Sequence, residues 1–121
     1  MSKLELRENL KKYSNPDTCP IRNVVARVSG KWSMLILCIL ADNDTTRFSE
    51  IRKALPDISP KVLSTTLKNL EEDGYISRQI YAEIPPRVEY SLTELGKDLM
   101  PHLWDLIEWA VANFDKITKH K

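Results

Sequence analysis

Residues 58–93, ISPKVLSTTLKNLEEDGYISRQIYAEIPPRVEYSLT, predict a helix followed by a two-stranded hairpin. The helix is expected to begin after Ser59, because a serine side chain caps a helix N-terminus and Pro60 suits the first helical position. It is expected to run to Asp73, since Gly74 suits the left-handed conformation that ends many helices. A helix with two defined ends therefore lies at the centre of the predicted fold.

The hairpin follows this helix directly. Residues 75–81 and 87–92 are rich in β-branched and aromatic side chains, and Pro85 and Pro86 stiffen the loop between them. Collecting the aliphatic side chains on one face of the hairpin determines its register. That register pairs Ile80 with Val88, Ile76 with Leu92, Tyr81 with Arg87 and Gln79 with Glu89.

Outside this unit the chain is expected to be mainly helical, because only three of its 121 residues are glycine. Helices are predicted over residues 4–13, 19–28, 31–41, 48–55 and 93–119, with a short strand over residues 45–47. Gly30 is expected to end the second helix. Short turn-linked helices followed by a hairpin are typical of a winged helix-turn-helix. The predicted fold class is mainly α with a small β-hairpin (α+β).

Two helices carry more apolar surface than one small domain can cover. In residues 31–41, Trp32, Leu35, Ile36, Ile39 and Leu40 form one apolar face, and Met34, Leu37 and Cys38 occupy the other. In the last helix, Leu99, Leu103, Leu106, Ala110, Phe114 and Ile117 follow a coiled-coil-like spacing of three and four. We therefore expect a homodimer that uses N- and C-terminal helices. The expected division is an N-terminal extension (1–18), a winged helix-turn-helix domain (19–92) and a dimerisation helix (93–121).

The helix after Ser59 has the two faces that DNA recognition requires. Leu63, Leu67 and Leu70 fall on one side, given roughly 100° per residue. The polar candidates for DNA contact on this helix are Ser59, Lys61, Ser64, Thr65 and Lys68. Lysines suit phosphate contacts, and short hydroxyl side chains suit base edges in the major groove. Because the helix ends in three acidic residues, only its N-terminal half is expected to enter the groove.

Local charge supports this assignment modestly. The net charge of the chain is +1, whereas residues 47–68 hold five cationic and two anionic residues. Alternatively, the lysines only keep an amphipathic helix soluble. Arg47 and Arg87 are further candidates, and Arg87 at the hairpin tip can reach the minor groove or flanking phosphates. Arg87 can also stack on Tyr81, which is compatible with a DNA contact, whereas Arg78 is expected to be structural.

The remaining residues narrow the function classes. Cys19 and Cys38 do not form a metal-ligand pair, and His102 and His120 lie apart from them, so no metal or cofactor is expected. No nucleophile–base–acid set or phosphate-binding glycine loop is visible, and the chain is not expected to be an enzyme. The longest apolar run, 34–41, is far shorter than the roughly 20 residues that span a bilayer. With no signal peptide visible, a cytoplasmic protein without a membrane partner is expected.

Several motifs together resemble the HxlR-type family of winged helix-turn-helix regulators, relatives of the MarR group. The matching segments are CPI at 19–21, GKWS at 30–33, RFSEI at 47–51, ISPKVLS at 58–64, LKNLEEDG at 67–74 and PPRVEYSLT at 85–93, with Gly96 and Trp109. The resemblance covers residues 19–109. The chain departs from the family at ADNDTT, 41–46, where a glycine-containing turn is usual.

The resemblance implies a dimeric bacterial DNA-binding regulator, and some members of the family respond to reactive electrophiles. The predicted function is a dimeric, sequence-specific transcriptional regulator that binds double-stranded DNA at a pseudo-palindromic operator. The operator, the sign of regulation and any small-molecule effector stay open. The alternative is a winged-helix protein-interaction module that does not bind DNA, which the near-neutral charge favours.

Cys19 is a candidate redox sensor. It precedes a helix-opening proline, and a helix N-terminus favours the reactive thiolate form of cysteine. The resemblance adds that the matching cysteine senses redox state in some relatives. The alternative is a small capping residue without reactivity. Cys38, inside an apolar helix, is expected to be an inert packing residue.

Overall fold

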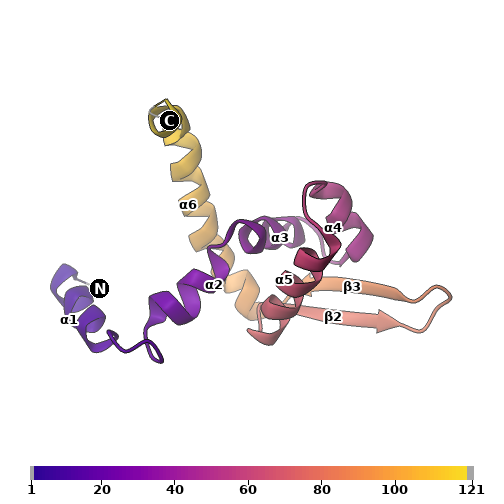
Figure 1. The fold of residues 1–121 in the computed structure, drawn as a ribbon, viewed down its shortest axis with the longest axis horizontal. Helices are drawn as coiled ribbons and strands as arrows, with labels where there is room; N and C mark the ends of the chain where they lie inside the picture. The colour runs from indigo at the N-terminus through magenta and orange to yellow at the C-terminus, as the bar shows by residue number, and fades with distance from the viewer. Residues whose placement is uncertain (1, 120–121) are drawn as a thin grey trace.

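The structure is a computed structural model that describes residues 2–119, except for the side chains of residues 10–12. Its elements are α1 (Lys3–Lys12), a π-helical turn η1 (Ile21–Val25), α2 (Ala26–Val28), α3 (Lys31–Ala41), β1 (Thr46–Arg47), α4 (Phe48–Ala54), α5 (Pro60–Glu72), β2 (Ile76–Tyr81), β3 (Arg87–Leu92) and α6 (Glu94–Thr118). In Figure 1, α3, α4 and α5 gather on one side of the β2–β3 hairpin, and α6 projects away from them. This is the mainly α fold with a β wing that the sequence predicts.

The core lies where α3 and α5 pack together and against the sheet. Ile36, Leu37 and Leu40 of α3 are buried with Ile51 of α4, and the three leucines of α5 are at most 2% exposed. The leucines of α5, Leu63, Leu67 and Leu70, are spaced by four and then three residues. They are buried together because positions with this spacing share one helix face. The opposite face of α5 is consequently left to solvent.

The sheet has three strands in the order β1–β3–β2, and both pairs are antiparallel. The predicted hairpin register is confirmed at all four predicted pairs, from Ile76 with Leu92 to Tyr81 with Arg87. Only the base of the aliphatic face is buried: Ile76 is 2% exposed, whereas Ile80 is 54% exposed. The reason is that the hairpin extends beyond the helices that cover its base (Figure 1).

A compact junction joins α5, the wing and α6. Gly74 has a φ of 88°, the left-handed conformation predicted for the end of α5. The hydroxyl of Thr93 donates to the Gly74 carbonyl at 2.6 Å and accepts from the Gly96 amide at 3.1 Å, so it caps α6 while tying it to the turn after α5. A Cβ atom at Gly96 would overlap the Tyr75 carbonyl oxygen. The end of α5 and the start of α6 therefore meet in a closely packed, hydrogen-bonded contact.

Three details of the N-terminal half differ from the sequence prediction. The second helix begins as the π-helical turn η1 rather than as an α-helix. Gly30 does not end it: Ser29 is its C-cap, and Gly30, with extended ψ of 149°, is the N-cap of α3. In α3, Leu37 belongs to the core and Leu35 is 40% exposed, because the sheet and α5 pack on the face that includes Leu37.

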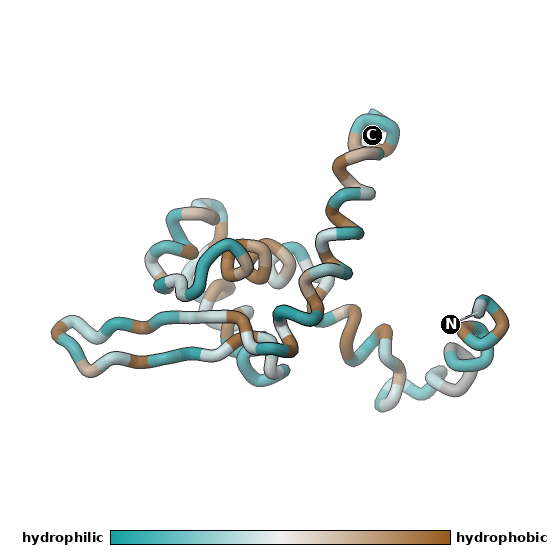
Figure 2. Tube along the Cα trace, turned by 180° about the vertical axis from the view of Figure 1, so that it is seen from behind, coloured by the Kyte–Doolittle hydropathy of each residue, from teal (hydrophilic) through white to brown (hydrophobic). Residues whose placement is uncertain are grey.

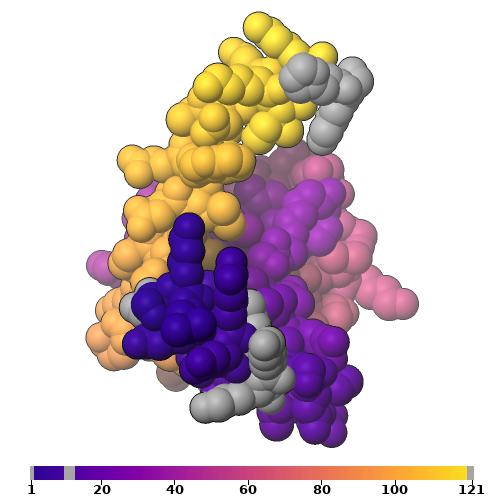
Figure 3. All heavy atoms as spheres, turned by 90° about the vertical axis from the view of Figure 1, so that its left-hand side faces the viewer, coloured from indigo at the N-terminus to yellow at the C-terminus, as the bar shows by residue number. Residues whose placement is uncertain are grey.

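Much of α6 stands clear of the rest of the chain. Its first turns pack on α3 and β3, where Met100 and Leu103 are buried, and the helix then continues into solvent. Figure 2 shows apolar segments recurring along this projecting part, and Figure 3 shows its far end rising above the body. The large apolar side chains exposed there are Trp104, Leu106, Trp109, Val111, Phe114 and Ile117.

Within residues 2–119, no single helix has the length and apolar character needed to cross a membrane. The bent pair Ile21–Val28 and Lys31–Ala41, at 61° to each other, meets the length and composition criteria only when the two are taken together. The face of α3 that packs into the core accounts for part of this apolar character.

Candidate nucleic-acid interface

The outer face of α5 presents a row of polar side chains. Lys61, Ser64, Thr65 and Lys68 are all exposed, while the leucines of the same helix are buried beneath them. The Ser59 hydroxyl accepts a hydrogen bond from the Val62 amide at 3.1 Å, which confirms it as the N-cap. Because the Ser59 oxygen accepts this bond through one lone pair, the hydroxyl hydrogen of Ser59 stays available to donate to an acceptor on DNA.

The acidic C-terminal end of α5 is paired with arginines of other elements. Arg27 of α2 donates to Asp73 at 2.6 Å, and this hydrogen bond raises the pKa of the Arg27 guanidinium. Arg78 of β2 lies 3.7 Å from Glu71, which supports the structural role predicted for Arg78. The C-terminal end of the helix is thereby held to the body, whereas Lys61 and Lys68 form no ion pair with a carboxylate of the described residues.

The segment β1–α4 adds cationic side chains beside α5. Arg47 is exposed, and its backbone amide donates to Glu50 at 3.0 Å. Arg52 and Lys53, which the sequence analysis counted only in the local charge, are also exposed and border a hollow with Phe48, Ser49 and Pro56. The predicted helix 48–55 already placed both residues on the first helix of a helix-turn-helix. That prediction was a signal for adding α4 to the candidate site.

At the wing tip, Arg87 already has partners within the chain. Its guanidinium stacks on Tyr81, with 4.1 Å from Cζ to the ring centroid, as one predicted alternative proposed. It also lies 3.3 Å from a carboxylate oxygen of Glu83 and 3.3 Å from one of Glu89. The Arg87 Nε–H is not directed at the Glu89 oxygen, so the second contact is an ion pair without a hydrogen bond. Arg87 is therefore a partly buried, neutralised cation rather than a free one.

The two cysteines have different surroundings. Cys19 is 8% exposed, and its carbonyl accepts hydrogen bonds from the amide and the side chain of Asn23. It directly precedes the helical residue Pro20, and the Asn23 amide bond to its carbonyl is the first i to i+4 bond of this helical segment, so its predicted place at the helix start is confirmed. Burial, aided by the charge of Asp42, raises the pKa of the Cys38 thiol, which disfavours its thiolate. This environment fits the packing role predicted for Cys38.

Among residues 2–119, no group of three or more His, Cys, Asp and Glu side chains converges in a way that could hold a metal ion. His102 is exposed on α6, and His120 lies outside the described residues. The candidate site is the polar and cationic surface of α5 and α4, with the wing beside it. Such a surface, mounted on a helix-turn-helix with a hairpin beside it, defines a winged-helix DNA-binding protein.

Comparison with known proteins gives the family. The model of the HxlR-like helix-turn-helix family matches residues 27–118. An HTH-type transcriptional regulator of Methanothermobacter thermautotrophicus is 47% identical over 92 residues, which cover 76% of this chain and 70% of the relative. The chain belongs to the HxlR-like helix-turn-helix family and is a transcriptional regulator, as the motifs predicted.

Solved structures agree in fold. The structure of the transcriptional regulator YtfH from Salmonella typhimurium has a TM-score of 0.77 and 38% identity, covering 86% of this chain and 92% of that one. The redox regulator HypR in its reduced form also has a TM-score of 0.77, with 35% identity over 83% of this chain and 98% of HypR. The winged-helix fold class is therefore confirmed.

Proposed function

We propose that this protein binds double-stranded DNA as a homodimer at a pseudo-palindromic operator. The observation that carries this proposal is the outer face of α5, where exposed hydroxyl and lysine side chains are held by a fully buried leucine face. In this proposal α5 enters the major groove by its N-terminal end, and Arg47 approaches the DNA phosphate backbone beside it. The contact residues of the helix are Ser59, Lys61, Ser64, Thr65 and Lys68. Arg87 contributes from the wing.

The proposed dimer interface is the apolar surface of α6. Leu106, Trp109 and Phe114 are each more than half exposed in the single chain, and water is a poor environment for so much contiguous apolar surface. A second copy of α6 would cover it, with the N-terminal helix contributing. In this proposal residues 93–121 are the dimerisation helix, residues 19–92 the DNA-binding domain and residues 1–18 an extension; Met1 and residues 120–121 lie outside the described part.

The operator test uses the purified protein and random duplex DNA. After rounds of selection and sequencing, we expect recovered fragments to share a pseudo-palindrome whose half-sites are centred one helical turn, roughly 34–36 Å, apart. The two-fold symmetry of a dimer requires this spacing or a multiple of it. Fragments without any common sequence would reject sequence-specific binding and favour the alternative, a protein-interaction module. In the proposed role the protein acts by binding in the cytoplasm, without catalysis and without a membrane partner.

Redox regulation through Cys19 is a second proposal. The fold shared with HypR, whose reduced and oxidised forms are both known, supports it. Because Cys19 is 8% exposed in the single chain, an oxidant gains full access only when the segment around Pro20 opens. Reactive cysteines are usually partly exposed, so local opening is part of this proposal.

The redox prediction compares operator affinity before and after diamide treatment for wild type, Cys19→Ser and Cys38→Ser. We expect diamide to change the affinity of wild type and Cys38→Ser by about fivefold or more, a typical lower range for coupling between two sites. Cys19→Ser should not respond, because it lacks the oxidisable sulfur. An equal response of wild type and Cys19→Ser would exclude Cys19 as the sensor.

A further inference from the structure

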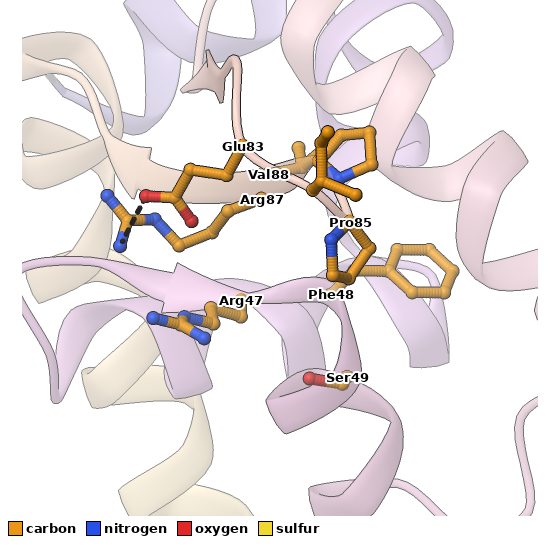
Figure 4. A pocket seen from close by; sticks show the side chains of 9 residues that line it. Arg47, Phe48, Ser49, Glu83, Pro85, Arg87 and Val88 are labelled. Atoms are coloured by element: carbon orange, nitrogen blue, oxygen red, sulfur yellow. Dashed lines mark ion pairs between the residues drawn. The ribbon is translucent and has the colours of Figure 1, made fainter.

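The wing tip and the start of α4 line an open cavity of about 500 Å³. Figure 4 shows the two arginines of this cavity on different walls, Arg87 on the wing and Arg47 at the end of β1, with Phe48 and Pro85 towards its other end. A dashed line in the same figure marks the ion pair between Glu83 and Arg87. The cationic groups nearest the wing tip therefore line one space, and a carboxylate shares it with them.

Both arginines of the wing are already paired with carboxylates. Arg78 faces Glu71 of α5, and Arg87 faces Glu83 and Glu89. Residues 76–92 hold these two arginines and two glutamates, so the wing has no net charge. A neutral wing attracts phosphate much less than a wing with a free guanidinium does.

The two carboxylates beside Arg87 differ in how easily their ion pairs with Arg87 can break. Glu89 lies within β3, its side chain is 16% exposed, and it is fixed by the strand pairing with β1 and β2. Glu83 lies in the loop at the tip, with a side chain that is 51% exposed. Ion pairs of exposed side chains are weak and exchange readily with solvent or with another anion.

We propose that Glu83 competes with the DNA backbone for Arg87, holding the guanidinium against Tyr81 and so limiting the affinity that the wing contributes. A guanidinium binds a carboxylate and a phosphate through the same planar set of N–H donors, and it cannot serve both fully at once. When a phosphate replaces Glu83, Arg87 and Arg47 both face it from the walls of the cavity. No carboxylate of the described residues lies within ion-pairing distance of Arg47.

Glu83 is thus a positioning residue that sets affinity, and this inference rests on the proposed DNA binding. The direct test is the variant Glu83→Gln, which keeps the side-chain shape and removes the charge. The matched control is Glu94→Gln, another surface glutamate with one cationic partner, Lys97 at 3.5 Å, located at the start of α6. Each variant raises the net charge by one, so the control corrects for the general effect of charge.

We expect Glu83→Gln to bind the selected operator about two- to fivefold more tightly than Glu94→Gln, the range for releasing one exposed ion pair. The plot of log affinity against log salt should become steeper by up to about 0.9, because one more cation then contacts phosphate. In an Arg87→Ala background, Glu83→Gln should have no effect beyond that of Glu94→Gln. This third comparison distinguishes two explanations for tighter binding. In the first, Glu83→Gln frees Arg87 to contact phosphate; in the second, it only removes a carboxylate that repels DNA.

Two results would overturn the inference: equal affinities of Glu83→Gln and Glu94→Gln, or the same tightening by Glu83→Gln with and without Arg87. Either can occur while wild type still binds its operator, in which case DNA binding stands and only the role of Glu83 is rejected. A wild-type protein that binds no duplex would reject the proposed function and this inference together. Thermal melting of each variant confirms that the exposed loop substitution leaves the fold intact.

Discussion

Replacing both Lys61 and Lys68 with alanine is expected to lower operator affinity at least about tenfold and to reduce the salt dependence of binding. Both side chains are exposed on the face of α5 opposite its buried leucines. A hydrogen bond to a charged group is worth roughly 1.5–3 kcal/mol, so losing two such contacts exceeds a tenfold change. The slope of log affinity against log salt should fall by about 0.9 for each phosphate contact that is lost.

The measurement is fluorescence anisotropy with the selected duplex at four or more salt concentrations. The matched control is Lys97→Ala with Lys119→Ala, which removes the same two charges from exposed positions on α6 and at its end. Alanine favours helix, so the α5 variant should keep its fold. If both double variants bind like wild type, α5 is not the recognition helix.

Introducing glutamate at both Leu106 and Phe114 is expected to convert the dimer to monomers and to lower operator affinity by about 100-fold or more. These side chains are 51% and 61% exposed in the single chain, so the substitutions do not disturb its core. In a dimer they would place charges inside an apolar interface, which is strongly unfavourable. In a dimer, binding of one subunit to its half-site gives the second subunit a high effective concentration at the other half-site. This linkage can raise the overall affinity by about 10²–10⁴, and a monomer loses that gain.

The oligomeric state is measured by sedimentation equilibrium and the affinity by anisotropy on the same samples. The Lys97→Ala, Lys119→Ala variant again serves as control, because it changes the net charge by the same −2 without placing charge on the apolar stripe. A monomeric double-glutamate variant with wild-type affinity would show that dimerisation is not needed for DNA binding. A dimeric variant would show that the interface lies elsewhere, for instance on the exposed apolar residues of η1.

Family and fold were predictable because their signals are local. Ser59 and Pro60 at one end of α5 and Gly74 at the other determine the helix through side-chain capping and backbone conformation, and neither depends on distant contacts. The hairpin register followed from the alternation of its side chains, since a shift by one residue would reverse the two faces. The candidate face of α5 followed from helical periodicity alone.

Features that depend on which surfaces meet in space were not predictable in this way. The sequence showed that α3 is apolar on all sides, but the packing of the sheet and α5 decided that Leu37 is buried and Leu35 exposed. Cys19 was correctly assigned to a helix start, but local signals could not predict that it is only 8% exposed. Helical spacing also suggested a stripe on α6, while the exposure of Trp104, Trp109 and Val111 widened that apolar surface.

By itself the sequence determined the elements, their order, the register of the wing and the polar face of α5, because capping, periodicity and side-chain alternation act over a few residues. The stack of Arg87 on Tyr81 followed from that register, but the tertiary structure alone decided the ion pairs of Arg87. The loop conformation and the side-chain positions bring Glu83 and Glu89 to its guanidinium, and Coulomb attraction over 3.3 Å then compensates a charge that the sequence presents as free.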